Sequence, residues 1–227
     1  MCKNLKLASF LEATNLSPTA RLAEINELCQ KALDYRFAAV CIHPYYVPFA
    51  ASLLQDSGIK VVTVAGFPLG CNDGLTKARE AELAVKNGAA EIDMMMNLAA
   101  LKNGEKDVVI KEVAAVVSSG AIVKTIIETG YLTREEVLLA CFCVQEGGAH
   151  FIKTCTGFGP RGVTLEDILM LRSHLPPAMG IKAAGGIKTA AFATALIMAG
   201  ASRLGTSAAA KIMQQAESEA CRNREDI

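Results

Sequence analysis

Three lysines and one aspartate stand inside short apolar runs of this 227-residue chain, where charged side chains are uncommon. Lys124 lies in IVKTIIE, Lys153 in HFIKTCTG, Lys182 in GIKAAGG and Asp93 in EIDMMM. A lysine in an exposed strand would be an ordinary solvated residue, and one buried lysine could be a structural ion pair. If helices cover these runs, however, each buried cation needs a partner or a chemical task.

Lys153 and Lys182 fall in consecutive predicted strands, whose axes would lie ~4.8 Å apart. Two ammonium groups about 5 Å apart repel by roughly 3.3 kcal/mol at an effective dielectric of ~20. This repulsion would lower the pKa of one lysine from ~10.4 toward ~8, and desolvation acts in the same direction. The neutral amine that results can attack a carbonyl carbon and form a Schiff base. The spacing does not distinguish which lysine is the nucleophile.

Asp93 has two possible roles beside such a lysine. Its carboxylate could hold a water molecule or move protons while the imine forms and breaks down. Alternatively, it is only the counter-ion that keeps Lys124 or Lys182 charged. The sequence leaves this choice open.

Small residues follow the last two predicted strands and indicate a phosphate site. Loops of this composition expose backbone N–H groups, and barrels often bind phosphate with the loops after strands seven and eight. The same glycines would serve as caps and tight turns if no ligand binds there. Arg161 or Lys188 could add positive charge. The candidate phosphate-binding residues are Gly185, Gly186, Gly205 and Ser207, with Gly157 in a third loop.

The elements that must position these residues repeat along the chain. Eight apolar runs alternate with helix-like segments, and 227 residues divided by eight gives about 28 per unit, ample for a strand and a helix. Thr133 with Glu136, and Thr164 with Asp167, have the spacing of helix starts. The eight predicted strands are Phe10–Ala13, Ala38–His43, Val61–Ala65, Glu91–Met96, Ile122–Glu128, Phe151–Thr154, Ile181–Ala184 and Arg203–Thr206.

This alternation predicts an α/β fold, a single (β/α)8 TIM barrel over residues 1–227, with a polar C-terminal tail from about residue 215. Consecutive apolar residues such as Val61-Val62 are typical of parallel strands covered on both faces. A doubly wound open sheet is the alternative. The missing G-x-G-x-x-G signature after the first strand disfavours it.

The composition excludes several classes of function. Lys plus Arg (23) cancels Asp plus Glu (23), which argues against bulk binding to nucleic acid or to an anionic membrane. The longest uncharged stretch, residues 37–55, is broken by Pro44 and Pro48, so we expect no membrane span. The eight cysteines form no C-x-x-C pair and we expect no export signal, which favours a cytoplasmic protein with reduced thiols. The three histidines lie far apart, so we predict no metal and no cofactor.

Several motifs resemble those of the deoxyribose-phosphate aldolase family: FIKTCTGFGPRG, GIKAAGGIKT, EIDMMMN, VCIHPYYV, GFPLG, IIETGYLT and RLGTSAAA. They occur in the expected order between residues 11 and 210. The resemblance implies a class I aldolase that cleaves 2-deoxy-D-ribose 5-phosphate to D-glyceraldehyde 3-phosphate and acetaldehyde. It implies that Lys153 forms the Schiff base, that Asp93 relays protons and that Lys182 perturbs the nucleophile. It also implies a homodimer that acts on small sugar phosphates and aldehydes in deoxynucleoside breakdown.

The chain departs from the family pattern at four positions. Its first strand reads Glu12-Ala13-Thr14 where the family usually has an Asp-His-Thr run. His43 replaces a common asparagine, Phe158 a lysine of some members, and Ala208 a second serine. None of these changes removes the three catalytic residues, so we expect activity, with weaker phosphate binding or altered substrate preference. Further predicted substrate contacts are Glu12, Thr14, Cys41, Lys124 and Thr156.

Two other functions fit the same residues. One is another Schiff-base barrel, such as a transaldolase or a hexose-phosphate aldolase, acting on a longer sugar phosphate. The other, motivated by Ala13 and Ala208, is a sugar-phosphate-binding barrel that has lost catalysis.

Overall fold

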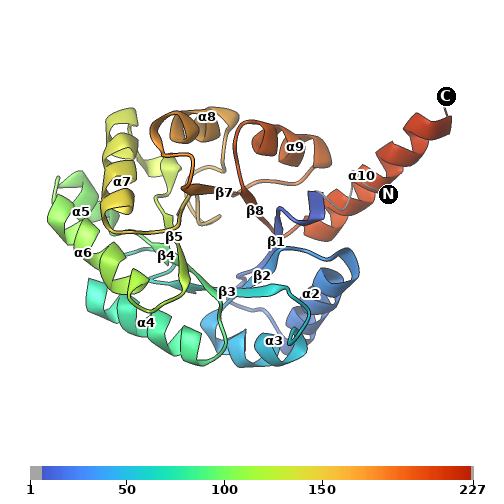
Figure 1. Ribbon diagram of the computed structural model, residues 1–227, viewed down its shortest axis with the longest axis horizontal. Helices are drawn as coiled ribbons and strands as arrows, with labels where there is room; N and C mark the ends of the chain where they lie inside the picture. The colour runs from blue at the N-terminus through green and yellow to red at the C-terminus, as the bar shows by residue number, and fades with distance from the viewer. Residues whose placement is uncertain (1–6, 226–227) are drawn as a thin grey trace.

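Eight parallel strands close into a barrel in the computed structural model, which describes residues 7–225 of the chain (Figure 1). Each strand pairs with the next, and β8 pairs with β1 to close the ring. The predicted (β/α)8 fold is therefore confirmed, and the open doubly wound sheet is excluded. The strands are β1 Leu11–Asn15, β2 Ala39–Ile42, β3 Lys60–Ala65, β4 Glu91–Met95, β5 Ile122–Ile126, β6 Phe151–Lys153, β7 Gly180–Ala184 and β8 Arg203–Thr206.

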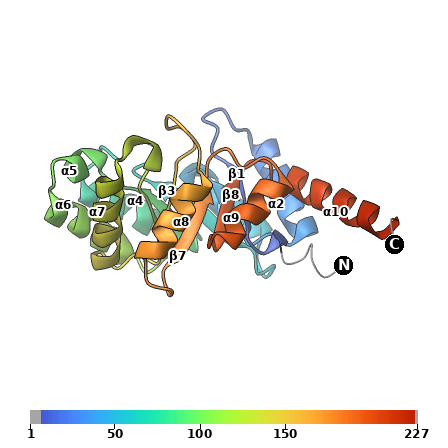
Figure 2. The same ribbon diagram turned by 90° about the horizontal axis from the view of Figure 1, so that it is seen from above.

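Helices surround the strands, and α10 extends away from the ring at one side (Figures 1 and 2). The predicted helix starts at Thr133 and Thr164 are confirmed, because each side chain accepts the backbone N–H three residues on in a capping box. Residues 215–225 of the expected polar tail belong to α10, and residues 226–227 lie outside the described part of the chain. The helices are α2 Leu22–Tyr35, α3 Val47–Leu53, α4 Gly74–Lys86, α5 Leu98–Lys102, α6 Lys106–Val117, α7 Arg134–Glu146, α8 Leu165–His174, α9 Ala190–Met198 and α10 Ala209–Glu225, with 3-10 turns η1 Pro44–Tyr46 and η2 Thr129–Tyr131.

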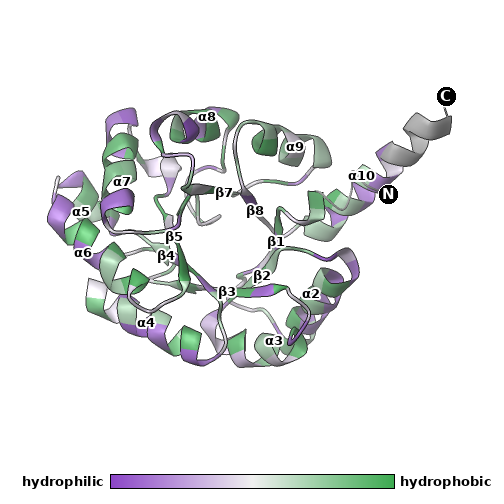
Figure 3. Cartoon of the chain, in the orientation of Figure 1, coloured by the Kyte–Doolittle hydropathy of each residue, from purple (hydrophilic) through white to green (hydrophobic). Residues whose placement is uncertain are grey.

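Alternate residues of each strand face two different environments. On β2, Val40 and Ile42 belong to the large apolar cluster between the barrel and its helices. Cys41 belongs instead to a small cluster with Val62 and Val64 of β3, inside the barrel. The hydrophilic residues gather on the outer helices (Figure 3). No helix in the described part of the chain is long and apolar enough to cross a membrane.

The barrel interior is apolar on one side and charged on the other. Strands β2 and β3 supply the small apolar cluster, whereas β1 and β4 to β8 supply charged side chains that alternate with the apolar residues of the outer core. This alternation follows from the two-residue period of a strand. The charged interior side chains are Glu12, Glu91, Asp93, Lys124, Lys153, Lys182 and Arg203.

A separate buried ion pair holds helices α4 and α6 together beside the barrel. Lys77 Nζ lies 2.6 Å from Glu112 Oε2, and both side chains are buried. Glu112 Oε1 also accepts the backbone N–H of Asn97 at 2.7 Å, at the end of β4. The pKa of Glu112 is raised, because the effect of burial exceeds the opposing effect of the neighbouring Lys77. The Lys77 side chain also lies under Gly66, where a Cβ would come within 2.8 Å of Lys77 Cε. The pair therefore supports the loops after β3 and β4.

We predict that Lys77→Met lowers the free energy of unfolding by about 3–5 kcal/mol, because it leaves the buried carboxylate of Glu112 unpaired. The double substitution Lys77→Met with Glu112→Gln should recover part of that loss, since glutamine is uncharged and can still accept the Asn97 N–H. Urea unfolding measures the free energy of unfolding of the single and the double variant. Lys31→Met is the control, because its ion pair with Glu27 is exposed and should contribute little. Equal losses for Lys77→Met and Lys31→Met would contradict the prediction.

Candidate active site

The Asp93 carboxylate lies at the centre of the charged half of the barrel. Its Oδ2 is 2.8 Å from Lys153 Nζ and 2.6 Å from Lys182 Nζ, while its Oδ1 is 3.2 Å from Lys124 Nζ. All four side chains are buried. One carboxylate therefore contacts all three lysines that the sequence singled out.

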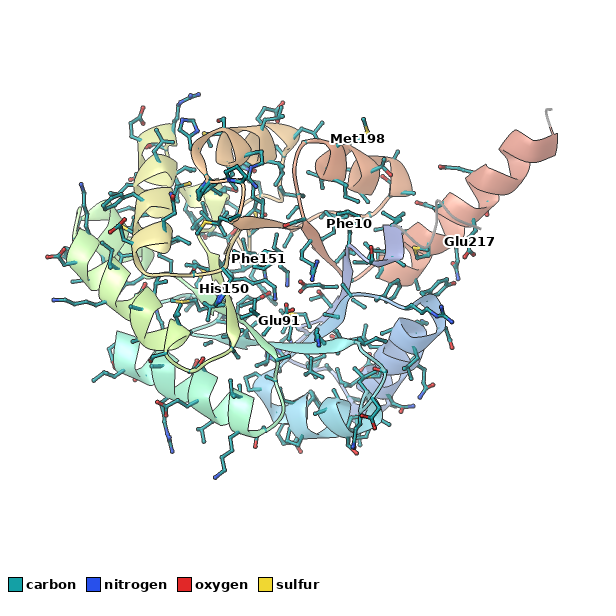
Figure 4. The ribbon with its side chains drawn as sticks, in the orientation of Figure 1. Phe10, Glu91, His150, Phe151, Met198 and Glu217 are labelled. Carbon is teal, nitrogen blue, oxygen red and sulfur yellow. The ribbon has the colours of Figure 1, made fainter. Side chains whose placement is uncertain are left out.

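Two glutamates supply the remaining negative charges that balance the three lysines. Glu12 contacts Lys182 through Oε2, and its Oε1 lies 3.6 Å from Lys124 Nζ. Glu91 also contacts Lys124, and it lies near the middle of the ring of strands (Figure 4). Three carboxylates thus face three ammonium groups. Arg203 Nε, 3.7 Å from Glu12 Oε1, adds a fourth cation at the edge of the cluster.

The strand register accounts for these contacts. Lys153 of β6 pairs directly with Lys182 of β7, and Asp93 of β4 pairs with Lys124 of β5. Residues in register point to the same side of a sheet, so all four side chains enter the barrel. Gly205 on β8 makes room for them, because a Cβ there would come within 2.9 Å of Lys182 Cε. The predicted neighbourhood of the two lysines is confirmed.

The carboxylates dominate the electrostatics of this cluster. Burial raises the pKa of Asp93, but Lys124, Lys153 and Lys182 outweigh it and hold that pKa well below its usual range. Burial lowers the pKa of Lys182, but Asp93 and Glu12 outweigh it and raise that pKa, so Lys182 is an ammonium group at neutral pH. Repulsion between two lysines alone is therefore an incomplete account, because it omits the carboxylate between them.

A cavity of about 480 Å³ opens beside this cluster, and Lys153 reaches its wall. Eight of the predicted site residues line the cavity: Thr14, Lys153, Thr156, Gly157, Gly185, Gly186, Gly205 and Ser207. Asp93, Lys182, Glu12, Cys41 and Lys124 are buried and are not part of the described wall. Substrate contact by the last three remains a prediction.

The glycine-rich part of the wall has the backbone conformation that glycine favours. Gly157, Gly185 and Gly186 have φ angles of +89°, +96° and +76°. Lys188 also lines the cavity. Arg161, the other cation considered, donates instead to both carboxylate oxygens of Asp167 at 2.6 and 2.9 Å. Lys188 is therefore the better placed of the two cations for a bound anion.

Ala208, one of the four departures from the family pattern, lacks a side-chain hydroxyl but keeps its backbone N–H. In the structure it donates to Thr206 Oγ1 at 2.9 Å, so it already has a partner. The departure at Ala208 thus removes a hydroxyl without leaving this N–H as a replacement donor.

The sequence analysis missed Glu128 and Phe67. Glu128 is buried at the end of β5 with a φ of +47°, and its carboxylate accepts the N–H of Thr156 at 2.9 Å and contacts its hydroxyl. Phe67 lies in the loop after β3, with its ring centroid 5.9 Å from Lys153 Nζ. Glu128 could have been found as a polar residue at a strand end. Phe67 lies within the GFPLG motif, but no residue spacing places its ring near Lys153.

His43 and Cys41 lie at the end of β2 and differ in their surroundings. His43 Nε2 is 2.9 Å from the carbonyl oxygen of Leu16, and His43 is not part of the described cavity wall. Cys41 Sγ lies 3.8 Å from Asp93 Oδ2 and is fully buried. Burial raises the pKa of the Cys41 thiol to about 11.

Comparisons with known proteins show the family of this chain. A family model described as DeoC/LacD family aldolase matches residues 5–215. The deoxyribose-phosphate aldolase of Thermoanaerobacter sp. (strain X514) is 47% identical over 216 residues, covering 93% of this chain and 97% of that protein. A solved aldolase named QR15 is 37% identical with a TM-score of 0.91, covering 97% of this chain and 99% of the other. The deoxyribose phosphate aldolase from Aeropyrum pernix, described as tetrameric, is 32% identical with a TM-score of 0.89, covering 96% of this chain and 94% of the other.

We predict that Cys41 resists alkylation in the folded protein. With a pKa of about 11, on the order of one thiol in a thousand is ionised at pH 8, and the thiolate is the reactive form. Iodoacetamide treatment at pH 8 followed by peptide mapping should label the exposed Cys71 and leave Cys41 unlabelled. Labelling of Cys41 at a rate near that of Cys71 would contradict the prediction.

Proposed function

This chain belongs to the DeoC/LacD family of aldolases, and we propose that it reversibly cleaves 2-deoxy-D-ribose 5-phosphate into D-glyceraldehyde 3-phosphate and acetaldehyde. The observation that carries the proposal is a buried lysine, Lys153, that reaches a cavity while its ammonium group contacts a carboxylate shared with a second lysine. That arrangement supplies an amine, a proton acceptor and a fixed cation within hydrogen-bond reach of one another.

Lys153 is better suited than Lys182 to be the nucleophile. Lys153 lines the cavity and contacts one carboxylate, that of Asp93. Lys182 is enclosed and contacts both Asp93 and Glu12, which raise its pKa. An amine must lose its proton before it attacks a carbonyl, so the lysine with less carboxylate contact is the better nucleophile. This assigns the Schiff base to Lys153 and the fixed cation to Lys182.

The reaction follows from these roles. The neutral amine of Lys153 attacks C1 of the open-chain sugar, and uptake of one proton with loss of one water molecule leaves a protonated imine. This imine accepts the electron pair of the C2–C3 bond as it breaks, while a base removes the C3 hydroxyl proton. The products at this stage are D-glyceraldehyde 3-phosphate and an enamine on Lys153. Protonation of the enamine at C2 and hydrolysis then release acetaldehyde. Asp93, in contact with Lys153, is the group proposed to relay these protons.

The phosphate end of the substrate is assigned to the glycine-rich wall. Gly157, Gly185, Gly186 and Ser207 line the cavity together with Lys188. Backbone N–H groups and one lysine suit a phosphate dianion. Binding energy from the phosphate, remote from the C2–C3 bond, then helps to hold the reacting carbons at Lys153.

We also propose a place for this activity in the cell. The substrate and products are small soluble metabolites, which fits a cytoplasmic enzyme of deoxynucleoside breakdown. We propose a homodimer, and sedimentation velocity tests it against a tetramer, the state described for the Aeropyrum pernix protein.

We predict that borohydride reduction in the presence of acetaldehyde traps a covalent adduct on Lys153. Peptide mapping identifies the modified lysine, and Lys153→Leu should abolish both the adduct and cleavage of deoxyribose 5-phosphate. A protein that forms no adduct would instead be a binding protein without catalysis. Faster turnover of fructose phosphates than of deoxyribose 5-phosphate would favour a different Schiff-base aldolase.

We predict that Lys182→Met moves the acid limb of the pH–rate profile to higher pH, by up to about two units. Without the second cation, the Asp93 carboxylate is no longer shared with Lys182 and stabilises only the ammonium form of Lys153. Lys153 should therefore lose its proton only at higher pH. The rate at pH 7 should fall about ten- to a hundredfold. The measurement is kcat/KM for deoxyribose 5-phosphate against pH.

Lys188→Met is the matched control, since it removes one lysine from the cavity wall but leaves the Asp93 cluster intact. It should raise KM for the phosphorylated substrate and leave the acid limb in place. An acid limb that stays unchanged in Lys182→Met would contradict the electrostatic role given to Lys182.

A further inference from the structure

An aromatic ring faces the nitrogen that forms the Schiff base. The Phe67 ring centroid lies 5.9 Å from Lys153 Nζ, within the range of a cation–π contact. Phe67 is half-buried in the loop between β3 and α4 and lies against the small apolar cluster inside the barrel, which includes Cys41 and Val64. Lys153 therefore has the Asp93 carboxylate on one side and an apolar ring on another.

The position of this ring is held by its neighbours. Phe158 contacts it edge-on, with centroids 5.6 Å apart and an interplanar angle of 82°. The preceding residue, Gly66, donates its N–H to Glu80 Oε2 at 2.5 Å. Gly66 also accepts the N–H of Gly70 at 2.8 Å through its carbonyl oxygen. The ring thus belongs to a fixed loop, which suits a defined electrostatic contact.

Schiff-base formation changes what the lysine nitrogen needs from its surroundings. An ammonium group has three N–H donors, and Lys153 directs one toward Asp93. A protonated imine keeps a single N–H, and its positive charge spreads onto a carbon atom that makes no ordinary hydrogen bond. A carboxylate can pair with the N–H, but the charge on carbon is better stabilised by a polarisable, electron-rich surface.

We propose that Phe67 stabilises the protonated imine on Lys153 by a cation–π interaction. This inference rests on the Schiff-base mechanism proposed above. The step concerned is addition of the neutral Lys153 amine to the aldehyde carbon, uptake of one proton and loss of one water molecule, which leaves a C=N bond with a positive charge. The amine lone pair forms the new bond, and the carbonyl oxygen leaves in the water.

The contact acts on the stability of the covalent intermediate more than on the rate of C–C cleavage. The protonated imine carries a charge, whereas the enamine that cleavage produces is neutral. A ring that stabilises the charge therefore favours formation of the imine and does not favour its conversion to the enamine. Weakening the contact should lower the fraction of protein held as imine and raise KM, while kcat falls little or rises.

The test replaces Phe67 with phenylalanine bearing one, two and three fluorine atoms on its ring, introduced by nonsense suppression. Fluorination weakens the negative face of the ring while changing its shape little. The fraction of Lys153 trapped with acetaldehyde and cyanoborohydride is measured against aldehyde concentration. The equilibrium constant for imine formation should fall stepwise, by about tenfold across the series. The equilibrium constant for imine formation in Phe67→Leu should be equal to or lower than that of the protein with three ring fluorines.

The same three fluorinated residues at Phe142 provide the control. Its exposed ring also faces a lysine, Lys106, with Nζ 5.7 Å from the centroid, but it lies on α7, outside the described cavity wall. Fluorination of Phe142 should leave the equilibrium constant for imine formation on Lys153 unchanged. A flat series at Phe67 with normal trapping of Lys153 would overturn the cation–π role and leave the Schiff base standing. Absence of trapping in the unmodified protein would instead refute the proposed function itself.

Discussion

A single carboxylate shared by three buried lysines is the constraint on which this barrel depends. Asp93 contacts Lys153 and Lys182 with one oxygen and Lys124 with the other. Removal of any one partner would leave an uncompensated charge among buried side chains, which is costly. Glu12 and Glu91 are needed for the same reason, because Asp93 alone cannot balance three cations. The charge balance therefore sets the residue types on several strands at once.

The same cluster separates two tasks that one lysine could not perform. Lys182, enclosed by two carboxylates, is kept as a cation, while Lys153 reaches the cavity, where we propose that it acts as the nucleophile. The apolar half of the barrel contributes as well. It places an aromatic ring beside Lys153, where the positive charge of the proposed imine would develop. Charged and apolar halves of the interior thus meet at Lys153 Nζ, the proposed nucleophile.

The fold and the catalytic neighbourhood could be predicted because both follow from short-range patterns. Strand periodicity placed Lys153 and Lys182 in adjacent strands, and the structure pairs them in register. Contacts between distant loops could not be predicted in the same way. Phe67 reaches Lys153 from a loop 86 positions earlier in the chain (153 − 67), and no spacing rule covers such a contact. The hydrogen bond from the Ala208 N–H to Thr206 Oγ1 is local, but it depends on turn geometry, which strand periodicity does not describe. The predicted repulsion between Lys153 and Lys182 left out the Asp93 carboxylate, because strand order alone did not show that Asp93 contacts both lysines.

The most direct test of the shared carboxylate is the pH dependence of Lys153 trapping in Asp93→Asn. The midpoint for adduct formation with acetaldehyde and cyanoborohydride is compared with that of the unaltered protein, and thermal unfolding verifies that the variant is folded. Without the carboxylate, Lys153 has only cations as close charged neighbours and should lose its proton more readily. The account predicts a midpoint lower by about one pH unit or more. A midpoint that stays the same or moves to higher pH would contradict it.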